Sequence, residues 1–308
     1  MIGSVSSFFR IDSSRASKLI GGAAMLLWAL SFSTLLSLVK TLSPDLNSIL
    51  IVFLRYLFGI ICFAPFLIKA GPTAFYTSRP LLHLIRVCCL AIATLCTYYA
   101  YRHLPLVLAT SVGMTGPLFT TMLAMLLLGE SVSLSKWGLI FLGYLGVLVM
   151  VRPFDMSFDA GIGVALLANL FSGLGIISVK VLSRTESTPT LLLYVNTFTT
   201  LIAGVLAISV WEIPSLHDFI ILMIVGVLGL LSQYSLIIAM KHANPSYLAP
   251  FEYMRMCFAI PVGYLFFAEV PTFWVLVGST IIIAATYGLT RLELTPRLSQ
   301  KKDQTSSR

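Results

Sequence analysis

Arg102-His103 is followed by Gly129-Glu130 in the first half of the chain, and 139 positions later Lys241-His242 is followed by Ala268-Glu269. The similarity continues near the start of each half, where single residues recur 140 positions apart. They are Gly21, Leu26, Leu27 and Lys40, repeated as Gly161, Leu166, Leu167 and Lys180. We interpret the second half of the chain as a displaced copy of the first.

Apolar stretches of membrane-spanning size make up most of the chain. Hydrophobic residues account for 58% of the 308 residues and charged residues for only 10%, and the mean hydropathy is +0.95. This composition excludes a soluble fold, and runs near 20 apolar residues are typical of transmembrane helices. We predict ten spans, at residues 19–39, 49–68, 81–100, 106–128, 137–151, 161–179, 191–210, 219–239, 247–268 and 273–292.

Five is an odd number of spans, so the second copy must enter the bilayer from the opposite side. The predicted fold is an all-α integral membrane protein with ten transmembrane helices arranged as two inverted five-helix repeats. The first repeat covers residues 19–151, the second covers 161–292, and a polar cytoplasmic tail covers 293–308. The loops, of roughly 4 to 20 residues, are too short for a soluble catalytic domain.

Lysine and arginine are distributed unevenly between the two sides of the predicted bundle. With the N-terminus placed inside, fourteen of the 20 basic residues fall in inside segments, and only Lys40, Arg102 and Arg152 fall outside. Cytoplasmic loops retain positive charge, so both termini are predicted to be cytoplasmic. The net charge of +8 follows from this bias. Because the charge is dispersed over short loops and a tail, we expect no nucleic-acid partner.

Glu252 is the only acid placed clearly inside a span, which makes it the first candidate for a functional group. Arg255 lies three residues later and so shares its helix face. Three interpretations stay open. Glu252 carries a proton or binds a cationic group, or Glu252 and Arg255 form a structural ion pair, or Glu252 lies close enough to the cytoplasmic surface to stay in contact with water.

Other charged side chains within spans are all basic. Arg55 and Arg255 are candidates for holding a substrate carboxylate, because a guanidinium binds a carboxylate with two parallel hydrogen bonds. His83 and Arg86 follow closely after Pro80, so we expect their side chains to reach back to the inner membrane interface. No metal-ligand spacing occurs and the five cysteines lie inside spans, so we expect no metal or other cofactor.

Polar and conformationally special residues complete the predicted site. Tyr99, Gln233 and Tyr253 neighbour repeat-related positions and are predicted to contact substrate. Asn169 and Asn196 are expected mainly to join helices. Proline and glycine predict gating kinks at Gly116, Pro117, Pro250 and Pro261. Close helix packing is predicted at Gly138, Gly143, Gly146, Gly278 and Gly288.

An ordered series of short motifs resembles the drug/metabolite transporter superfamily, in particular its ten-span type with duplicated EamA domains. In the first half the series is Phe53-Leu54-Arg55-Tyr56, then residues 79–86, Tyr98-Tyr99-Ala100-Tyr101-Arg102-His103-Leu104-Pro105, Pro117-Leu118-Phe119 and Leu128-Gly129-Glu130. In the second half it is Lys241-His242, Ala249-Pro250-Phe251-Glu252-Tyr253 and Ala268-Glu269. Tyr194 stands where the repeat would place a counterpart of Arg55, so we expect an asymmetric substrate site.

The resemblance implies a secondary transporter that moves a small polar metabolite across a bacterial inner membrane by alternating access. Residues 79–86 and 249–255 resemble the branch that includes S-adenosylmethionine transporters, although members of that branch can carry the Arg and Glu of the second stretch in the opposite order. The specific prediction is S-adenosylmethionine uptake or exchange, with a proton or an exchanged metabolite as coupling species. An amino-acid or drug exporter of the same fold is the alternative, and a membrane-embedded enzyme is a distant one.

Overall fold

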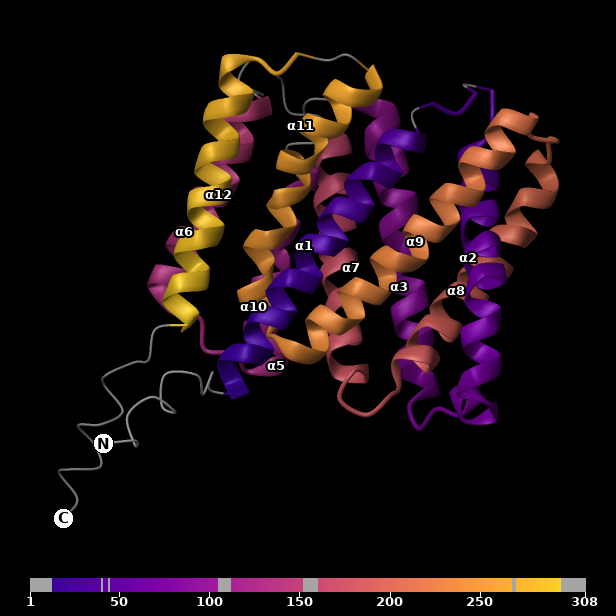
Figure 1. Cartoon of the computed structure of the whole chain (residues 1–308), viewed down its shortest axis with the longest axis horizontal. Coiled ribbons are helices and arrows are strands. Elements are labelled where there is room, and N and C mark those ends of the chain that lie inside the picture. The colour runs from indigo at the N-terminus through magenta and orange to yellow at the C-terminus, as the bar shows by residue number, and fades with distance from the viewer. Residues whose placement is uncertain are drawn as a thin grey trace, which may run out of the picture.

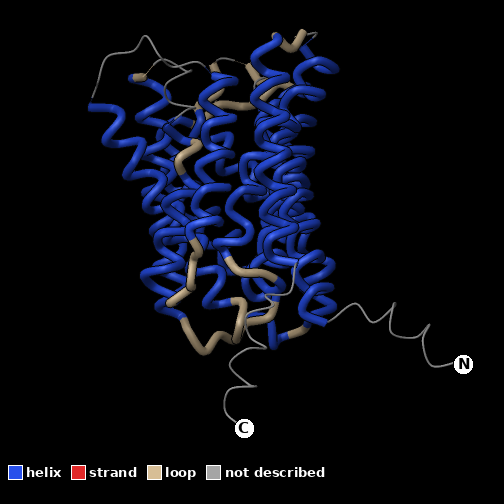
Figure 2. Tube along the Cα trace, turned by 90° about the vertical axis from the view of Figure 1, so that its left-hand side faces the viewer, coloured by secondary structure: helices blue, strands red, loops and turns tan. Residues whose placement is uncertain are grey.

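The computed structural model describes residues 13–39, 41–43, 45–104, 112–151, 160–267 and 270–294. All regular structure in this part of the chain is helical, and the helices run lengthwise through one bundle (Figure 2). Lys40, Arg152, the Ala268-Glu269 pair, the start of the predicted fourth span and the tail after Leu294 lie outside the described residues. The predicted all-α class is confirmed.

Ten spans are present in the described part, as predicted. Eight are long apolar helices: α1 (Ser13–Val39), α2 (Ser48–Ala70), α3 (Pro80–His103), α6 (Leu134–Val151), α7 (Ala160–Leu182), α8 (Thr188–Ala207), α9 (Leu216–His242) and α12 (Phe273–Leu294). The fourth span contains the shorter helix α5 (Gly116–Leu128). The ninth contains α10 (Pro245–Leu248), the 3-10 helix η3 (Ala249–Tyr253) and α11 (Met254–Phe267). Two more 3-10 helices, η1 (Pro72–Phe75) and η2 (Ile208–Val210), follow α2 and α8.

Local sequence sets several of the helix ends. Before α2, the Asn47 Oδ1 accepts a hydrogen bond from the Ile49 N–H at 2.9 Å, and before α9, the Ser215 Oγ accepts one from the Asp218 N–H at 3.1 Å. Both side chains satisfy backbone donors that have no partner inside the helix. Gly129 ends α5 with a φ of 66°, a left-handed conformation that glycine adopts without strain.

The ninth span differs from the continuous helix predicted at residues 247–268. Pro245 and Pro250 cannot donate a backbone hydrogen bond, and the chain here forms a short helix followed by a tighter 3-10 turn before α11 begins. Pro261 lies inside α11 and does not end it. The span is therefore broken near Glu252, at the residues that the sequence indicates as functional.

Contacts between helices follow the duplication. In the repeat, α7, α9 and α11 are the counterparts of α1, α3 and α5. α1 packs against α9, and in the same way α7 packs against α3. α1 also packs against α11, and α7 packs against α5. α2 contacts its own counterpart α8, and α6 contacts α12. In Figure 1, α6 and α12 form one edge of the bundle, α1, α5, α7, α10 and α11 lie in the middle, and α2, α3, α8 and α9 lie on the other side. Exchanging the two halves preserves these contacts, as two equivalent repeats require.

The equivalent helices α1 and α7 run in opposite directions. Ser17, near the start of α1, donates to the His242 carbonyl at 2.9 Å, and Lys180, near the end of α7, donates to the Ala243 carbonyl at 2.7 Å. The beginning of one helix and the end of the other therefore meet at the same end of the bundle, and the predicted inversion is confirmed. We call this end, defined by Ser17, Lys180 and His242, the terminal face.

Glycines allow α6 and α12 to approach closely. A Cβ added at Gly146 would lie 2.8 Å from the Gly278 carbonyl oxygen, and one at Gly143 would lie 2.7 Å from the Tyr253 ring. A Cβ at Gly288 would lie 3.0 Å from Leu139. The predicted close packing is confirmed at these positions. It is wrong for Gly138, where an added Cβ would meet no heavy atom within 4 Å.

Candidate functional site

Glu252 is buried in the break of the ninth span. Its side chain lies in η3 with an exposed fraction of 6%, and no described residue forms a hydrogen bond or ion pair with its carboxylate. The broken helix places this acid between α10 and α11 instead of on the surface of a regular helix. A buried carboxylate without a partner is costly, so its position favours a functional group over a packing residue.

The Glu252 carboxylate faces the start of α5, where a turn at Met114 and Thr115 breaks the fourth span. A Cβ added at Gly116 would lie 4.0 Å from the Glu252 Oε2 and 3.6 Å from the Asn169 Oδ1, so the two oxygens converge on this glycine. The Asn169 amide nitrogen donates to the Val112 carbonyl at 2.7 Å and to the Thr115 Oγ1 at 2.8 Å. Those bonds fix the amide so that its oxygen faces Gly116. Sequence reasoning assigned Asn169 to helix joining, although it is a polar residue inside a span.

Arg255 forms no hydrogen bond or ion pair with Glu252. Its Nη2 donates to the Met114 Sδ at 3.4 Å, its guanidinium lies 5.8 Å from the centre of the Phe32 ring, and its Nε is buried without a hydrogen-bond partner. The ion pairs of the described residues do not include Arg255. The structural ion pair that the sequence left open is therefore not formed in this structure, where the Arg255 guanidinium lies against Met114 and Phe32 instead.

Arg55 lies against α9 about one turn from Gln233, which belongs to that helix. Arg55 on α2 is half-buried and packs against Gly229, where an added Cβ would lie 2.8 Å from its Nε. Gln233 lies four residues further along α9 and accepts a hydrogen bond from the Arg86 Nη2 at 3.5 Å. The absence of a side chain at Gly229 allows Arg55 to reach α9.

The expectation that His83 and Arg86 extend to the interface is wrong. Their exposed fractions are 1% and 3%. The Arg86 Nη1 donates to the Leu191 carbonyl at 3.2 Å, and the His83 ring lies 4.3 Å from the Tyr194 ring. Arg86 points into the bundle because α8 and α9 offer it acceptors there. The sequence carried one usable signal, a charge within a span, but not the direction of the side chain.

The remaining predicted site residues have different surroundings. Tyr253 is fully buried, with its ring against Gly143. Tyr99 lies on α3 with an exposed fraction of 46%. Gly116 and Pro117 begin α5 at the break of the fourth span, and Pro250 accepts a hydrogen bond from the Thr286 Oγ1 at 3.3 Å. Of these residues, Gly116 lies nearest to the Glu252 carboxylate.

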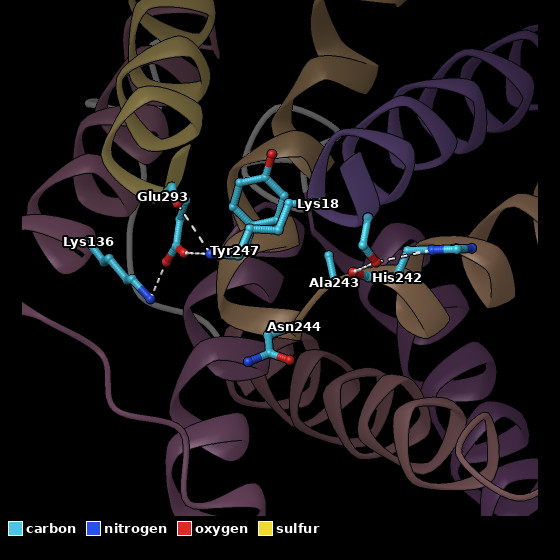
Figure 3. A pocket seen from close by; sticks show the side chains of 8 residues that line it. Lys18, Lys136, His242, Ala243, Asn244, Tyr247 and Glu293 are labelled. Atoms are coloured by element: carbon cyan, nitrogen blue, oxygen red, sulfur yellow. Dashed lines mark hydrogen bonds and ion pairs between the residues drawn. The ribbon is translucent and has the colours of Figure 1, made fainter. Parts of the chain in front are cut away.

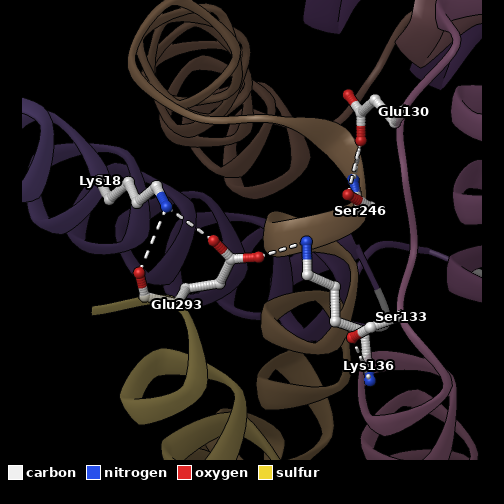
Figure 4. Close-up of polar contacts among 6 residues, drawn as sticks. All are labelled: Lys18, Glu130, Ser133, Lys136, Ser246 and Glu293. Carbon is white, nitrogen blue, oxygen red and sulfur yellow. Dashed lines mark hydrogen bonds and ion pairs between the residues drawn. The ribbon is translucent and has the colours of Figure 1, made fainter. Parts of the chain in front are cut away.

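A small polar cavity of about 220 Å³ opens at the terminal face (Figure 3). Glu293 at the end of α12 accepts a hydrogen bond from Lys18 at 2.6 Å and forms a second ion pair with Lys136 (Figure 4). Nearby, the Glu130 Oε2 accepts hydrogen bonds from the Ser246 Oγ at 2.5 Å and the Ser246 N–H at 3.3 Å. These bonds link the two halves of the chain and hold the terminal face together.

The sequence pattern of the EamA-like transporter family matches residues 19–152 and, separately, residues 159–291. This chain belongs to that family. The predicted membership of the drug/metabolite transporter superfamily is thereby confirmed, and transport, not catalysis, is the activity that the family supports. The EamA-like transporter is a multi-pass membrane protein.

Known relatives of this EamA-like transporter carry several substrates. The chain is 30% identical over 248 residues to an S-adenosylmethionine uptake transporter of Rickettsia prowazekii (strain Madrid E), covering 80% of this chain and 84% of the relative. It is 30% identical over 263 residues to a pseudopaline exporter of Pseudomonas aeruginosa (strain UCBPP-PA14), covering 85% and 92%. It is 29% identical over 253 residues to a riboflavin transporter of Brucella anthropi, covering 79% and 88%.

One solved crystal structure shares the fold across nearly the whole length of both chains. The TM-score is 0.73 with 17% sequence identity, and the match covers 90% of this chain and 97% of the other. Among the described residues, no group of histidine, cysteine, aspartate and glutamate side chains could hold a metal ion.

Proposed function

We propose that this EamA-like transporter carries S-adenosylmethionine across the bacterial inner membrane, by uptake or exchange. The proposal rests on one observation above all: the bundle holds charged groups of both signs that are not paired with each other, the buried Glu252 in the break of the ninth span and the half-buried Arg55 against α9. S-adenosylmethionine carries a carboxylate, an ammonium and a sulfonium. The choice of S-adenosylmethionine as the substrate is supported by relatives that are S-adenosylmethionine uptake transporters.

In the proposed site, Arg55 binds the anionic end of the substrate and Glu252 binds the cationic part. A guanidinium fork suits a carboxylate, and a buried carboxylate suits a sulfonium or a transferred proton. Gln233 supplies hydrogen bonds, and the aromatic ring of Tyr99 stacks on the adenine. Arg255, whose guanidinium lies beside Met114, is the second candidate for binding the substrate carboxylate.

The broken helices act as gates in this proposal. Gly116 and Pro117 start α5, while Pro250 and Pro261 lie in the ninth span. Breaks of this kind free backbone groups and let half-helices move around a site between the repeats. The coupling species is a proton carried by Glu252 or an exchanged metabolite. The bias of basic residues supports a cytoplasmic position for both termini.

The second candidate function is export of an amino-acid-like metabolite or drug. A specific observation favours it, because the pseudopaline exporter is as similar to this chain as the S-adenosylmethionine transporter is and matches more of its length. The fold allows both directions, since direction is set by gradients and coupling and not by the repeat.

One paired experiment separates the two functions. Cells that produce the protein are compared with cells that carry an empty vector, first for uptake of labelled S-adenosylmethionine and then for efflux from preloaded cells. The proposal predicts saturable uptake that unlabelled S-adenosylmethionine competes away, and counterflow when the substrate is present on both sides. Efflux of preloaded amino acids without any S-adenosylmethionine uptake would favour the exporter and refute the proposed substrate.

A further inference from the structure

Two arginines reach the same face of α9. Arg55 comes from α2 and packs its Nε against Gly229, and Arg86 comes from α3 and donates to Gln233. Gly229 and Gln233 are four residues apart, so they lie one above the other on one side of the helix, about 6 Å apart. The two guanidinium groups therefore lie against successive turns of α9.

Neither arginine has an acidic partner among the described residues. The ion pairs of that part of the chain join Lys18 and Lys136 to Glu293 and His217 to Asp218. The described hydrogen-bond partners of Arg86 are neutral, the Leu191 carbonyl and the Gln233 amide oxygen, and Arg86 is only 3% exposed. The Arg55 Nε is buried with no partner. Arg86 is buried and the neighbouring Arg55 is half-buried, and charges placed this way within a bilayer favour an anion that compensates them.

We infer that the missing anion is a carboxylate of the transported molecule, held between Arg55 and Arg86 on the face of α9. The inference rests on the proposed function, since it takes the ligand to be the transported metabolite. It extends that function by adding Arg86 to the binding site and by requiring a carboxylate in every well-bound substrate. The bonds from Arg86 to Leu191 and Gln233 use two of its five N–H groups and fix its plane, which leaves donors for a ligand.

Gly229 provides a way to disturb the site without removing a charge. An alanine there would place its Cβ 2.8 Å from the Arg55 Nε, a distance that a flexible side chain relieves by moving away. Gly229→Ala should therefore displace Arg55 from α9. Arg86→Gln removes the second charge, and Arg86→Lys keeps the charge but loses the planar fork. Arg184, exposed just after α7, provides the control variant Arg184→Gln.

The test compares matched ligands that differ only by the carboxylate. The purified full-length protein is titrated with S-adenosylmethionine and its decarboxylated analogue, and with ornithine and putrescine, and binding is followed by ligand-induced thermal stabilisation. In the wild type the carboxylated member of at least one pair should bind tenfold or more tightly than its partner. In Arg86→Gln and Gly229→Ala its affinity should fall about tenfold to a hundredfold. The decarboxylated partner should keep its wild-type affinity, and Arg184→Gln should change neither.

Each other result has a defined meaning. Equal loss of affinity for both members of a pair would show that Arg86 only supports the fold and would overturn the inference. If Arg86→Gln does not accumulate, Arg86→Lys and Gly229→Ala give the same comparison. Wild-type binding of ornithine without S-adenosylmethionine would refute the proposed substrate and leave the carboxylate site intact. If the wild type bound only the decarboxylated ligands, or none of the four ligands, the inference would be overturned.

Discussion

The Glu293 carboxylate, at the end of the last helix, accepts a 2.6 Å hydrogen bond from the ammonium group of Lys18, near the start of the first helix. The described ends of the chain therefore meet at the terminal face, as an even number of membrane crossings requires. Lys136 pairs with the same carboxylate, so a single acid connects α1, α6 and α12. This arrangement leads to the first two predictions.

We expect both termini to lie in the cytoplasm. The pair of Lys18 with Glu293 puts the described ends on one face, and the excess of lysine and arginine in the segments on that face predicts which side it is. Topology reporters fused to either end should be active only in their cytoplasmic form, with an insertion in the 211–215 loop as the opposite-side control. A periplasmic signal from either terminus would refute this orientation.

Replacing Glu293 with glutamine should loosen the terminal face. Glu293→Gln keeps the shape of the side chain but removes the charge that attracts Lys18 and Lys136. For partly exposed pairs the loss is about 1 kcal/mol, roughly a fivefold change in the opening equilibrium. Maleimide labelling of Ala243→Cys, at a buried position that lines the cavity, should speed up by that factor in a protein whose native cysteines are replaced. Asp45→Asn, exposed before α2, is the control, and an unchanged labelling rate would contradict the prediction.

Replacing Arg55 with lysine should reduce transport sharply while the protein still accumulates. Lysine keeps the positive charge but cannot form two parallel bonds to a carboxylate, so the expected loss is about tenfold or more in transport efficiency. Initial uptake rates, divided by the amount of folded protein in the membrane, measure the effect. Arg184→Lys should behave as the wild type. Full activity of Arg55→Lys would argue against bidentate recognition.

Replacing Glu252 with glutamine should abolish uphill transport. The amide preserves the volume of the side chain but cannot carry a proton or hold a negative charge. Counterflow separates the two roles: it survives if Glu252 only couples transport to protons, and it is lost together with substrate affinity if Glu252 binds the substrate. Glu212→Gln, exposed between α8 and α9, is the matched control.

A third outcome for Glu252→Gln is loss of folded protein. If adding Arg255→Gln then restored the yield, an ion pair in another conformation would be indicated, because the two side chains are not paired in this structure. Wild-type accumulation, affinity and counterflow in the single variant would remove Glu252 from the mechanism.

Alanine at Gly146 should destabilise the protein, whereas alanine at Gly138 should not. The new methyl group at Gly146 would meet the backbone of α12 at 2.8 Å, and backbone cannot move aside easily, so the cost is about 1–3 kcal/mol. At Gly138 no heavy atom lies within 4 Å, so only the better helix propensity of alanine acts. Thermal unfolding in detergent should show a lower midpoint for Gly146→Ala alone. Equal midpoints would show that α6 and α12 are not closely packed.

Much of the fold could be predicted from the sequence because its determinants are local. The length and apolarity of each stretch identify a span, and the recurrence of Gly129-Glu130 as Ala268-Glu269 after an odd number of spans identifies an inverted copy. The break at Pro250 was predicted as a kink, but the change to a 3-10 helix was not, because the sequence does not show which turn replaces the lost hydrogen bond.

The sequence by itself determined which charges lie within the membrane, and the tertiary structure decided their partners. Spacing within one helix left a pair of Glu252 and Arg255 open, but the structure places Glu252 beside Asn169 and Gly116. The nearness of Arg86 to Pro80 suggested that its side chain reaches the membrane interface, but the structure places it beside Gln233. The physical reason is distance along the chain. Periodicity reports the face on which a residue lies, whereas the acceptors that orient a buried side chain come from helices in the other half of the protein.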